Sequence, residues 1–231
     1  MAKSTQLTLP FPVNRRCIFD TFVVGANAEL ITRLQDLCGA RPMQGIWMWG
    51  EAGTGKSHLL QAACQQASGE SQLPVAYLPL GSLPLTANHL DGLDRFTFVA
   101  LDDVHLWLGT PALEAALIAL YQAMAGQGGC LLVAAPQPSA RYEFHYPDLR
   151  SRLAAFSTYR VRPLDDRGLG EALHRAAADR GLVLNQTVSD YWLTRRPREL
   201  VLLLADLDRI DALALAAGRR LTIPLLREAL D

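Results

Sequence analysis

The sequence predicts an α/β fold, in which a three-layer αβα domain with a five-stranded parallel sheet precedes a small all-helical unit. Short apolar runs alternate with helical patterns as far as about Val161. These runs lack the apolar-polar alternation of a sheet with one wet face, so both faces of the sheet should be covered. After Pro163 the strand-like runs stop and helical patterns alone continue.

The expected strands span 46–49, 75–80, 96–101, 129–134 and 157–161. Helical patterns lie at 28–38, 57–67, around 84–91, 111–125 and 148–154. Strands that alternate with helices favour parallel pairing, because a parallel connection needs a crossover, usually a helix.

The last part of the chain predicts four helices. They cover Asp165–Arg180, about 187–195, a long helix with Pro197 in its first turn that runs to Gly218, and Pro224–Leu230. We therefore expect a flexible tail over 1–12, the αβα domain over 13–162 and the helical domain over 163–231.

Composition excludes several classes of protein. A net charge of −1 and a pI of about 6.5 give no bulk attraction to nucleic acid or to an anionic membrane. No apolar run reaches the roughly 18 residues of a membrane span, and the histidines and cysteines show no metal-ligand spacing. The scattered cysteines are typical of reduced thiols in a cytoplasmic protein.

Residues Gly50–Ser57 (GEAGTGKS) match the phosphate-binding loop G-x-x-x-x-G-K-[ST] without a mismatch. Lys56 is one of only two lysines in a chain that otherwise uses arginine. A strand before the loop and a helix after it would aim backbone N–H groups at phosphates, and Ser57 would bind Mg²⁺. A glycine-rich turn without this function is the alternative. The expected nucleotide contacts here are Gly50, Ala52, Gly53, Thr54, Gly55, Lys56, Ser57 and His58.

Asp102 and Asp103 end the apolar run that begins at Phe98. In a protein with a phosphate-binding loop, Asp102 would lie beside the phosphates and hold Mg²⁺, and Asp103 would orient or polarise a water. An ordinary turn at a strand end is the alternative.

Arginines gather near the end of the αβα domain, at positions 141, 150, 152, 160 and 162. Asp148 is expected to cap a short helix that carries Arg150 and Arg152. Such a group can reach a phosphate across an interface, although a solvated basic face or a phosphate contact to nucleic acid is the more common use. Arg198 lies near the start of the long helix, where a cation needs a partner such as a bound phosphate or Glu199.

The tail alternates polar and apolar residues, which is typical of a short linear motif that docks in an apolar pocket. Packing on the chain's own surface is the alternative. The motif residues are Gln6, Leu7, Leu9, Pro10 and Phe11.

Taken together, these motifs resemble the DnaA/Hda family of AAA+ proteins over about residues 18–230. Phe19–Asn27 is similar to the family segment that helps to enclose the adenine, which implies roles for Phe22 and Val23. The loop, Asp102-Asp103, the Arg152 region and Arg198 follow in family order as Walker A, Walker B, arginine finger and sensor 2. Tyr146–Leu153 is close to the finger segment of the Hda group, and Gln6–Phe11 resembles the motif that binds the bacterial sliding clamp.

The resemblance implies a negative regulator of DNA replication initiation. Such a protein holds ADP (or ATP) with Mg²⁺, docks on the sliding clamp (the β subunit of DNA polymerase III) and places Arg152 against ATP held by DnaA. DNA would be contacted only through the clamp, and a homodimer or higher homo-oligomer is expected. Arg150 is the other candidate for the finger. The alternative is an AAA+ assembly factor of the helicase-loader or clamp-loader type.

The sequence departs from the family pattern after the fourth strand. An AAA+ ATPase carries a polar sensor 1 residue there, whereas this chain has Val133-Ala134-Ala135-Pro136. We therefore expect tight nucleotide binding with weak intrinsic hydrolysis.

Overall fold

The computed structural model describes residues 14, 16–37, 43–69, 73–84, 86–217 and 221–230. The chain divides into two compact units. The first holds the chain up to Phe19 together with Asn27–Val161, and the second holds Asp20–Ala26 together with the chain from Arg162 onward. The clamp-motif residues Gln6–Phe11 lie outside the described residues.

The first unit is built on a parallel sheet of five strands in the order β2-β3-β4-β1-β5. The strands are β1 (Gln44–Trp49), β2 (Val75–Pro79), β3 (Phe98–Asp102), β4 (Cys130–Ala135) and β5 (Ser157–Arg160). All residues of β3 and β4 are buried, as their unbroken apolar runs predict. The predicted three-layer αβα domain with a five-stranded parallel sheet is therefore confirmed.

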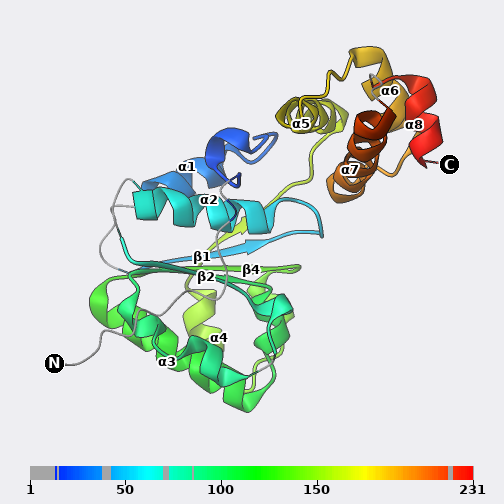
Figure 1. Cartoon of the computed structure of the whole chain (residues 1–231). Coiled ribbons are helices and arrows are strands. Elements are labelled where there is room, and N and C mark those ends of the chain that lie inside the picture. Colours follow the sequence, from blue (N-terminus) through cyan, green and yellow to red (C-terminus); the bar gives the residue numbers. More distant parts are fainter. Residues whose placement is uncertain are drawn as a thin grey trace. The chain divides into compact units, whose positions relative to one another are not determined.

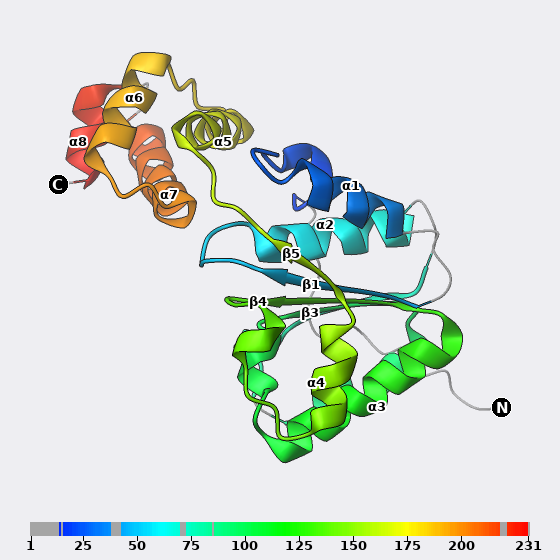
Figure 2. The same cartoon turned by 180° about the vertical axis from the view of Figure 1, so that it is seen from behind.

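Helices cover both faces of this sheet. The helices α1 (Ala28–Asp36) and α2 (Lys56–Gly69) lie on one face, and α3 (Pro111–Gln127) and α4 (Pro147–Ala154) lie on the other (Figures 1 and 2). Short 3-10 helices complete the unit at Phe19–Thr21, Leu80–Ser82, Ala87–Leu90, Leu93–Arg95, Val104–Trp107 and Ser139–Arg141.

One helix prediction in this unit is wrong. The pattern around 84–91 does not form an α-helix, and the described residues there contain only the 3-10 turn Ala87–Leu90. Asp91 is extended after this turn, and Gly92 follows with a φ of 77°, in the left-handed region. Neither conformation continues an α-helix. The apolar side chains that gave the helical pattern, such as the buried Leu90, reach the core from the 3-10 turn instead.

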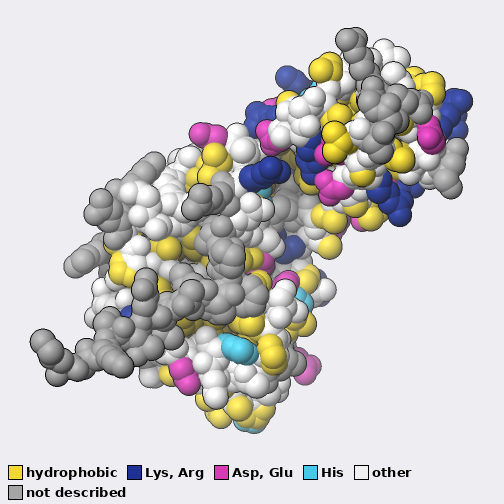
Figure 3. Space-filling model, in the orientation of Figure 1, with side chains coloured by type: hydrophobic (Ala, Val, Ile, Leu, Met, Phe, Trp, Pro, Cys, Tyr) yellow, Lys and Arg dark blue, Asp and Glu magenta, His cyan; other side chains and the backbone are white. Residues whose placement is uncertain are grey.

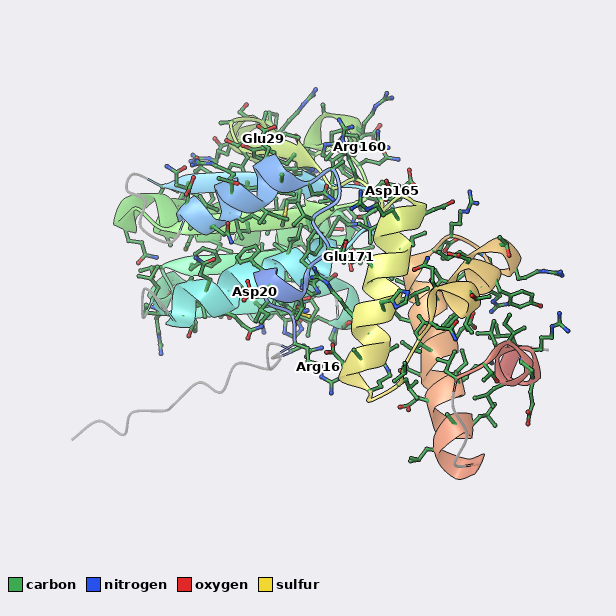
Figure 4. All side chains as sticks on the ribbon, turned by 90° about the horizontal axis from the view of Figure 1, so that it is seen from above. Arg16, Asp20, Glu29, Arg160, Asp165 and Glu171 are labelled. Carbon is green, nitrogen blue, oxygen red and sulfur yellow. The ribbon has the colours of Figure 1, made fainter. Side chains whose placement is uncertain are left out.

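The described residues of the second unit form four helices: α5 (Asp166–Asp179), α6 (Gln186–Arg195), α7 (Leu200–Ala217) and α8 (Ile223–Leu230). Asp165 caps α5 by accepting a hydrogen bond from the Gly168 N–H at 2.8 Å, and it lies at the start of that helix in Figure 4. A separate apolar core includes the fully buried Leu173, Trp192 and Leu203. The prediction of an all-helical unit after the sheet is confirmed.

The long helix starts later than the sequence pattern predicts. Pro197 is outside α7, which begins at Leu200, and the Glu199 carbonyl accepts the first helical bond from Leu203 N–H at 3.0 Å. Arg196 is extended, as a residue before proline must be, and its guanidinium binds Asp206 at 2.7 and 2.8 Å. This ion pair holds the segment before the helix in place. The spacing of apolar residues along the sequence does not predict it.

The segment Asp20–Ala26 groups with the helical unit, although it precedes the sheet in the sequence. Arg175 of α5 donates to the Asp20 carbonyl at 3.0 Å and to the Glu171 carboxylate at 2.5 Å, and Figure 4 labels both partners. Gly25 has a φ of 49°, and a Cβ there would lie 3.0 Å from the side chain of Leu164. None of the helices among the described residues is long and apolar enough to cross a membrane.

Candidate nucleotide site and arginine-bearing helix

The loop Gly50–Ser57 connects the end of β1 to the start of α2, as predicted. Gly53 and Gly55 have φ values of 76° and 93°, a conformation that only glycine adopts without strain. Gly50 is required for a different reason, because a Cβ there would lie 2.5 Å from the carbonyl oxygen of Val161, just after β5. The glycines of the motif thus let the loop turn tightly against the edge of the sheet.

Lys56 is the first residue of α2 and is 9% exposed. Its ammonium donates hydrogen bonds to the carbonyl oxygens of Gly50 and Glu51, at 2.7 and 2.8 Å. Burial lowers the pKa of Lys56, and the carboxylates of Asp102 and Asp103 oppose this shift. The ammonium therefore lies over the loop, where the negative charges of Asp102 and Asp103 stabilise it.

Asp102 ends β3 and is 3% exposed. Its carboxylate accepts hydrogen bonds from the Ser57 hydroxyl, from the Tyr77 hydroxyl at 3.0 Å and from the Asp103 N–H at 3.1 Å. Burial raises the pKa of Asp102, and the bonds from Ser57 and Tyr77 act against that rise. The structure thus brings together Ser57 and Asp102, the two residues that the sequence assigned to Mg²⁺.

Tyr77 is a site residue that sequence reasoning missed. It lies on β2, and burial together with the Asp102 charge raises its pKa strongly, so its hydroxyl remains a donor. The pairing of β2 with β3 brings this hydroxyl to Asp102. A polar aromatic residue in an otherwise apolar strand was the available signal.

Asp103 has a φ of 55°, and it is the one non-glycine residue with a positive φ in the described part of the chain. Its carboxylate is close to Gly81, where a Cβ would lie 2.7 Å from Oδ2, and to His105, whose Nδ1 is 4.0 Å from Oδ1. Burial lowers the pKa of His105. A left-handed backbone at a half-buried acid is the kind of strain that marks functional positions. The sequence analysis did not predict the neighbours Gly81 and His105.

His58 was predicted to contact nucleotide, and in the structure its imidazole contacts the backbone of the N-terminal segment. Its Nε2 lies 2.9 Å from the carbonyl oxygen of Ile18. One and two turns further along α2, Gln61 accepts from the Asn14 N–H and Gln65 donates to the carbonyls of Asn14 and Cys17. One polar face of α2 therefore holds the backbone of the segment that follows the tail.

Acid should destabilise the protein through His58. Burial lowers its pKa below the ordinary 6.5, although the bond to Ile18 acts in the opposite direction. Between these two pKa values the unfolded chain binds a proton that the folded chain does not. The free energy of unfolding should therefore fall as the pH falls through about 6.5, by at most about 1.4 kcal/mol per pH unit.

Urea unfolding at about pH 7.5 and about pH 5.5 measures this effect. The wild type should lose more stability on acidification than His58→Gln, which has no proton to gain. Equal losses in the two proteins would assign the acid sensitivity to other groups, with His105 the next to replace.

Arg152 is carried by α4 on the opposite face of the sheet from α2 (Figures 1 and 2). Its Nε donates to Asp148 Oδ2 at 2.7 Å, which raises the pKa of Arg152, and its guanidinium carbon lies 4.9 Å from the centre of the Tyr121 ring. The predicted cap is wrong, because Tyr146 is the N-cap and Pro147 begins the helix. Asp148 is inside the first turn, where it pairs with Arg152 one turn later.

Arg160 is near the loop. Its guanidinium lies 3.7 Å from Glu51 Oε1 and 5.2 Å from the centre of the Trp49 ring. Arg160 therefore lies beside the loop. Arg152 instead pairs with Asp148 of its own helix and packs on Tyr121 of α3.

In the helical unit, Arg198 Nε lies 3.1 Å from Asp166 Oδ1, with both side chains exposed. Arg198 borders a cavity of about 700 Å³ whose lining comes largely from α5 and α6 and includes His174 and Asp190. Several other arginines lie at the surface of this unit (Figure 3). Phe22 and Val23, each 8% exposed, also group with this unit and not with the unit that holds the loop.

Comparison with known proteins gives two family matches. Residues 166–230 match the Hda lid domain, and residues 13–82 match the bacterial DnaA ATPase domain.

Solved structures show a similar fold. Domain III of the replication initiation protein DnaA from Thermotoga maritima has a TM-score of 0.82 and 17% identity over 95% of this chain and 98% of that chain. Replication initiator DnaA bound to AMPPCP and single-stranded DNA has a TM-score of 0.69 and 18% identity over 86% of this chain and 65% of that chain. The Holliday junction branch migration motor RuvB of Thermotoga maritima has a TM-score of 0.65 and 15% identity over 88% of this chain and 68% of that chain.

Proposed function

The chain belongs to the DnaA/Hda family of AAA+ proteins, and from this premise we propose that it is a negative regulator of DNA replication initiation. It binds ADP, docks on the sliding clamp and stimulates hydrolysis of the ATP held by DnaA. Arg152 acts in trans as the arginine finger. The observation that carries the proposal is the match of the helical unit to the Hda lid, because it points to the regulator and not to the initiator.

The geometry of the loop supports binding of a nucleotide with Mg²⁺. Lys56 supplies a cation beside a turn made by Gly53 and Gly55, and the adjoining helix N-terminus favours phosphate. The hydroxyl of Ser57 and the buried carboxylate of Asp102 are already in contact, and hard oxygen ligands of this kind suit Mg²⁺. When bound, the ion neutralises phosphate charge. A related DnaA has been solved with AMPPCP.

Weak hydrolysis in the chain's own site follows from the residues around that site. Strand β4 is buried along its whole length and passes into Pro136 without a polar side chain that could hold the γ-phosphate or a water. Asp103 remains as a group that can orient water. We therefore propose that the nucleotide is chiefly a structural ligand, with Arg198 as a further phosphate contact and Phe22 and Val23 near the base.

The position of Arg152 supports action on a partner's nucleotide. Helix α4 and helix α2 lie on opposite faces of the sheet, so Arg152 projects from a different layer than the chain's own loop (Figures 1 and 2). An arginine beside a neighbouring subunit's phosphates stabilises charge that develops in the transition state. The same placement favours a homodimer or higher homo-oligomer when DnaA is absent.

Docking on the clamp is proposed for the tail residues Gln6, Leu7, Leu9, Pro10 and Phe11. An apolar linear motif on a tail can bind a pocket on another protein without disturbing the folded units. The clamp would then bring the protein to newly replicated DNA in the bacterial cytoplasm, with DNA contacted only through the clamp.

The deciding experiment follows ATP hydrolysis by DnaA in the presence of clamp loaded on DNA, with and without this protein. We expect acceleration that requires the clamp and that is lost in the double variant Gln6→Ala, Leu9→Ala. Steady turnover by this protein alone, without acceleration of DnaA, would overturn the proposal and indicate a self-contained ATPase.

A further inference from the structure

Glu114 is a completely buried carboxylate on the first turn of α3, far from the loop Gly50–Ser57 in the sequence. Its Oε1 accepts hydrogen bonds from the Gly109 N–H at 2.6 Å and the His145 N–H at 3.0 Å. Its Oε2 accepts from the Tyr146 N–H at 2.8 Å. All three donors belong to the backbone, so the carboxylate holds main chain and not side chains.

A fully buried glutamate requires an explanation, because burying a charge costs free energy unless hydrogen bonds compensate it. The neighbouring inward positions of α3 are apolar, including Leu113, Leu117 and Met124. An apolar residue at 114 would avoid the cost, but it would leave three backbone N–H groups without the acceptor that they have in this structure. The glutamate therefore defines where the segment before α4 runs.

Tyr146 is the N-cap of α4, so the bond to Glu114 holds the residue at which that helix begins. Seven positions along α3 from Glu114, on the same side of the helix, the ring of Tyr121 lies under the guanidinium of Arg152. Tyr121 is itself stacked on Phe156, with ring centres 6.1 Å apart. Helix α3 thus contacts α4 near both of its ends.

We propose that Glu114 is a positioning residue for the arginine finger. By fixing the Tyr146 N–H it sets the start of α4, and the short helix carries that placement to Arg152 and to the Tyr121 ring. The inference rests on the proposed function, because it assigns to Glu114 a part in stimulating the partner's hydrolysis. It adds a buried residue that would touch neither the nucleotide nor DnaA.

The test uses Glu114→Gln, which keeps the size of the side chain but turns one acceptor into a donor facing a backbone N–H. The maximal stimulated rate should fall by about 10- to 100-fold, as expected for a misplaced catalytic group. The concentration that gives half of this rate should change little, because the docking surfaces are intact. Glu114→Asp keeps the charge with a shorter reach, so its maximal stimulated rate should lie between those of the wild type and Glu114→Gln. If Glu114→Gln folds poorly, Glu114→Asp takes its place in the test.

Met124→Ala is the matched control, because Met124 is also fully buried on α3 but is one of its last residues. It should lower stability without a comparable loss of maximal rate. Equal losses of rate in Met124→Ala and Glu114→Gln would overturn the proposal, since general destabilisation would then explain both.

A second measurement needs no partner. Amide exchange at His145 and Tyr146, and the NMR signal of the Arg152 Nε–H that binds Asp148, report the placement of α4 in this protein alone. Both should change in Glu114→Gln and not in Met124→Ala, and unchanged signals would overturn the inference. If the wild type fails to stimulate DnaA, the proposed function falls, and these signals still decide whether Glu114 places Arg152.

Discussion

Replacing Arg152 by alanine is expected to abolish stimulation of ATP hydrolysis by DnaA, a loss of about 10³–10⁵-fold if the residue acts as fingers do in other phosphoryl-transfer systems. The fold should survive, because Arg152 is paired with Asp148 at the surface of α4, where ion pairs contribute little to stability. Binding of ADP should also persist, since α4, which carries Arg152, lies on the other face of the sheet from α2. Clamp binding should persist because the clamp motif is in the tail, at Gln6–Phe11. The measurement is single-turnover hydrolysis of DnaA-bound ATP with clamp on DNA.

Arg150→Ala is the control for this experiment, because Arg150 is exposed on the same short helix. It should leave stimulation within a few-fold of the wild type. If Arg152→Ala stimulates normally and Arg150→Ala does not, then Arg150 is the finger. Unchanged stimulation in both variants would remove α4 from the mechanism.

Lys56→Ala should weaken ADP binding by about 2–5 kcal/mol, or roughly 30- to 5,000-fold, as truncation of one member of a buried charge pair commonly does. Lys56 is 9% exposed, so its side chain is largely removed from water. Calorimetric titration with ADP and Mg²⁺ measures the dissociation constant. Weaker binding should also reduce the rise in melting temperature that ADP is expected to give the wild type.

Glu51→Ala is the matched control in the same loop. The side chain of Glu51 is 75% exposed and its contact with Arg160 is long, so affinity for ADP should change little. Unaltered ADP affinity in Lys56→Ala would mean that the loop does not bind phosphate as its sequence predicts. A similar loss in both variants would indicate that the loop as a whole is disturbed.

Much of the fold could be predicted because the evidence for it is local. Each strand is a short apolar run, and the loop Gly50–Ser57 carries its glycines, lysine and serine at adjacent positions. The contact of Ser57 with Asp102 was also expected, since the loop that follows β1 and the last residue of β3 lie at the same edge of a parallel sheet. Predictions from local patterns failed where a tertiary contact competes with them. Pro197 was expected in the first turn of the long helix, but Arg196 pairs with Asp206 and the helix begins only at Leu200.

The sequence by itself determined the fold class, the loop, the two aspartates at the end of β3 and the helix that carries Arg152. Only the tertiary structure decided that Tyr77 binds Asp102, that Asp20–Ala26 groups with the helical unit and that Glu114 holds the start of α4. The physical reason is the range of the interactions. Periodicity and motif spacing record neighbours along the chain, whereas a hydroxyl on β2 or a carboxylate on α3 finds its partner only after the strands take their order and the helices cover the sheet.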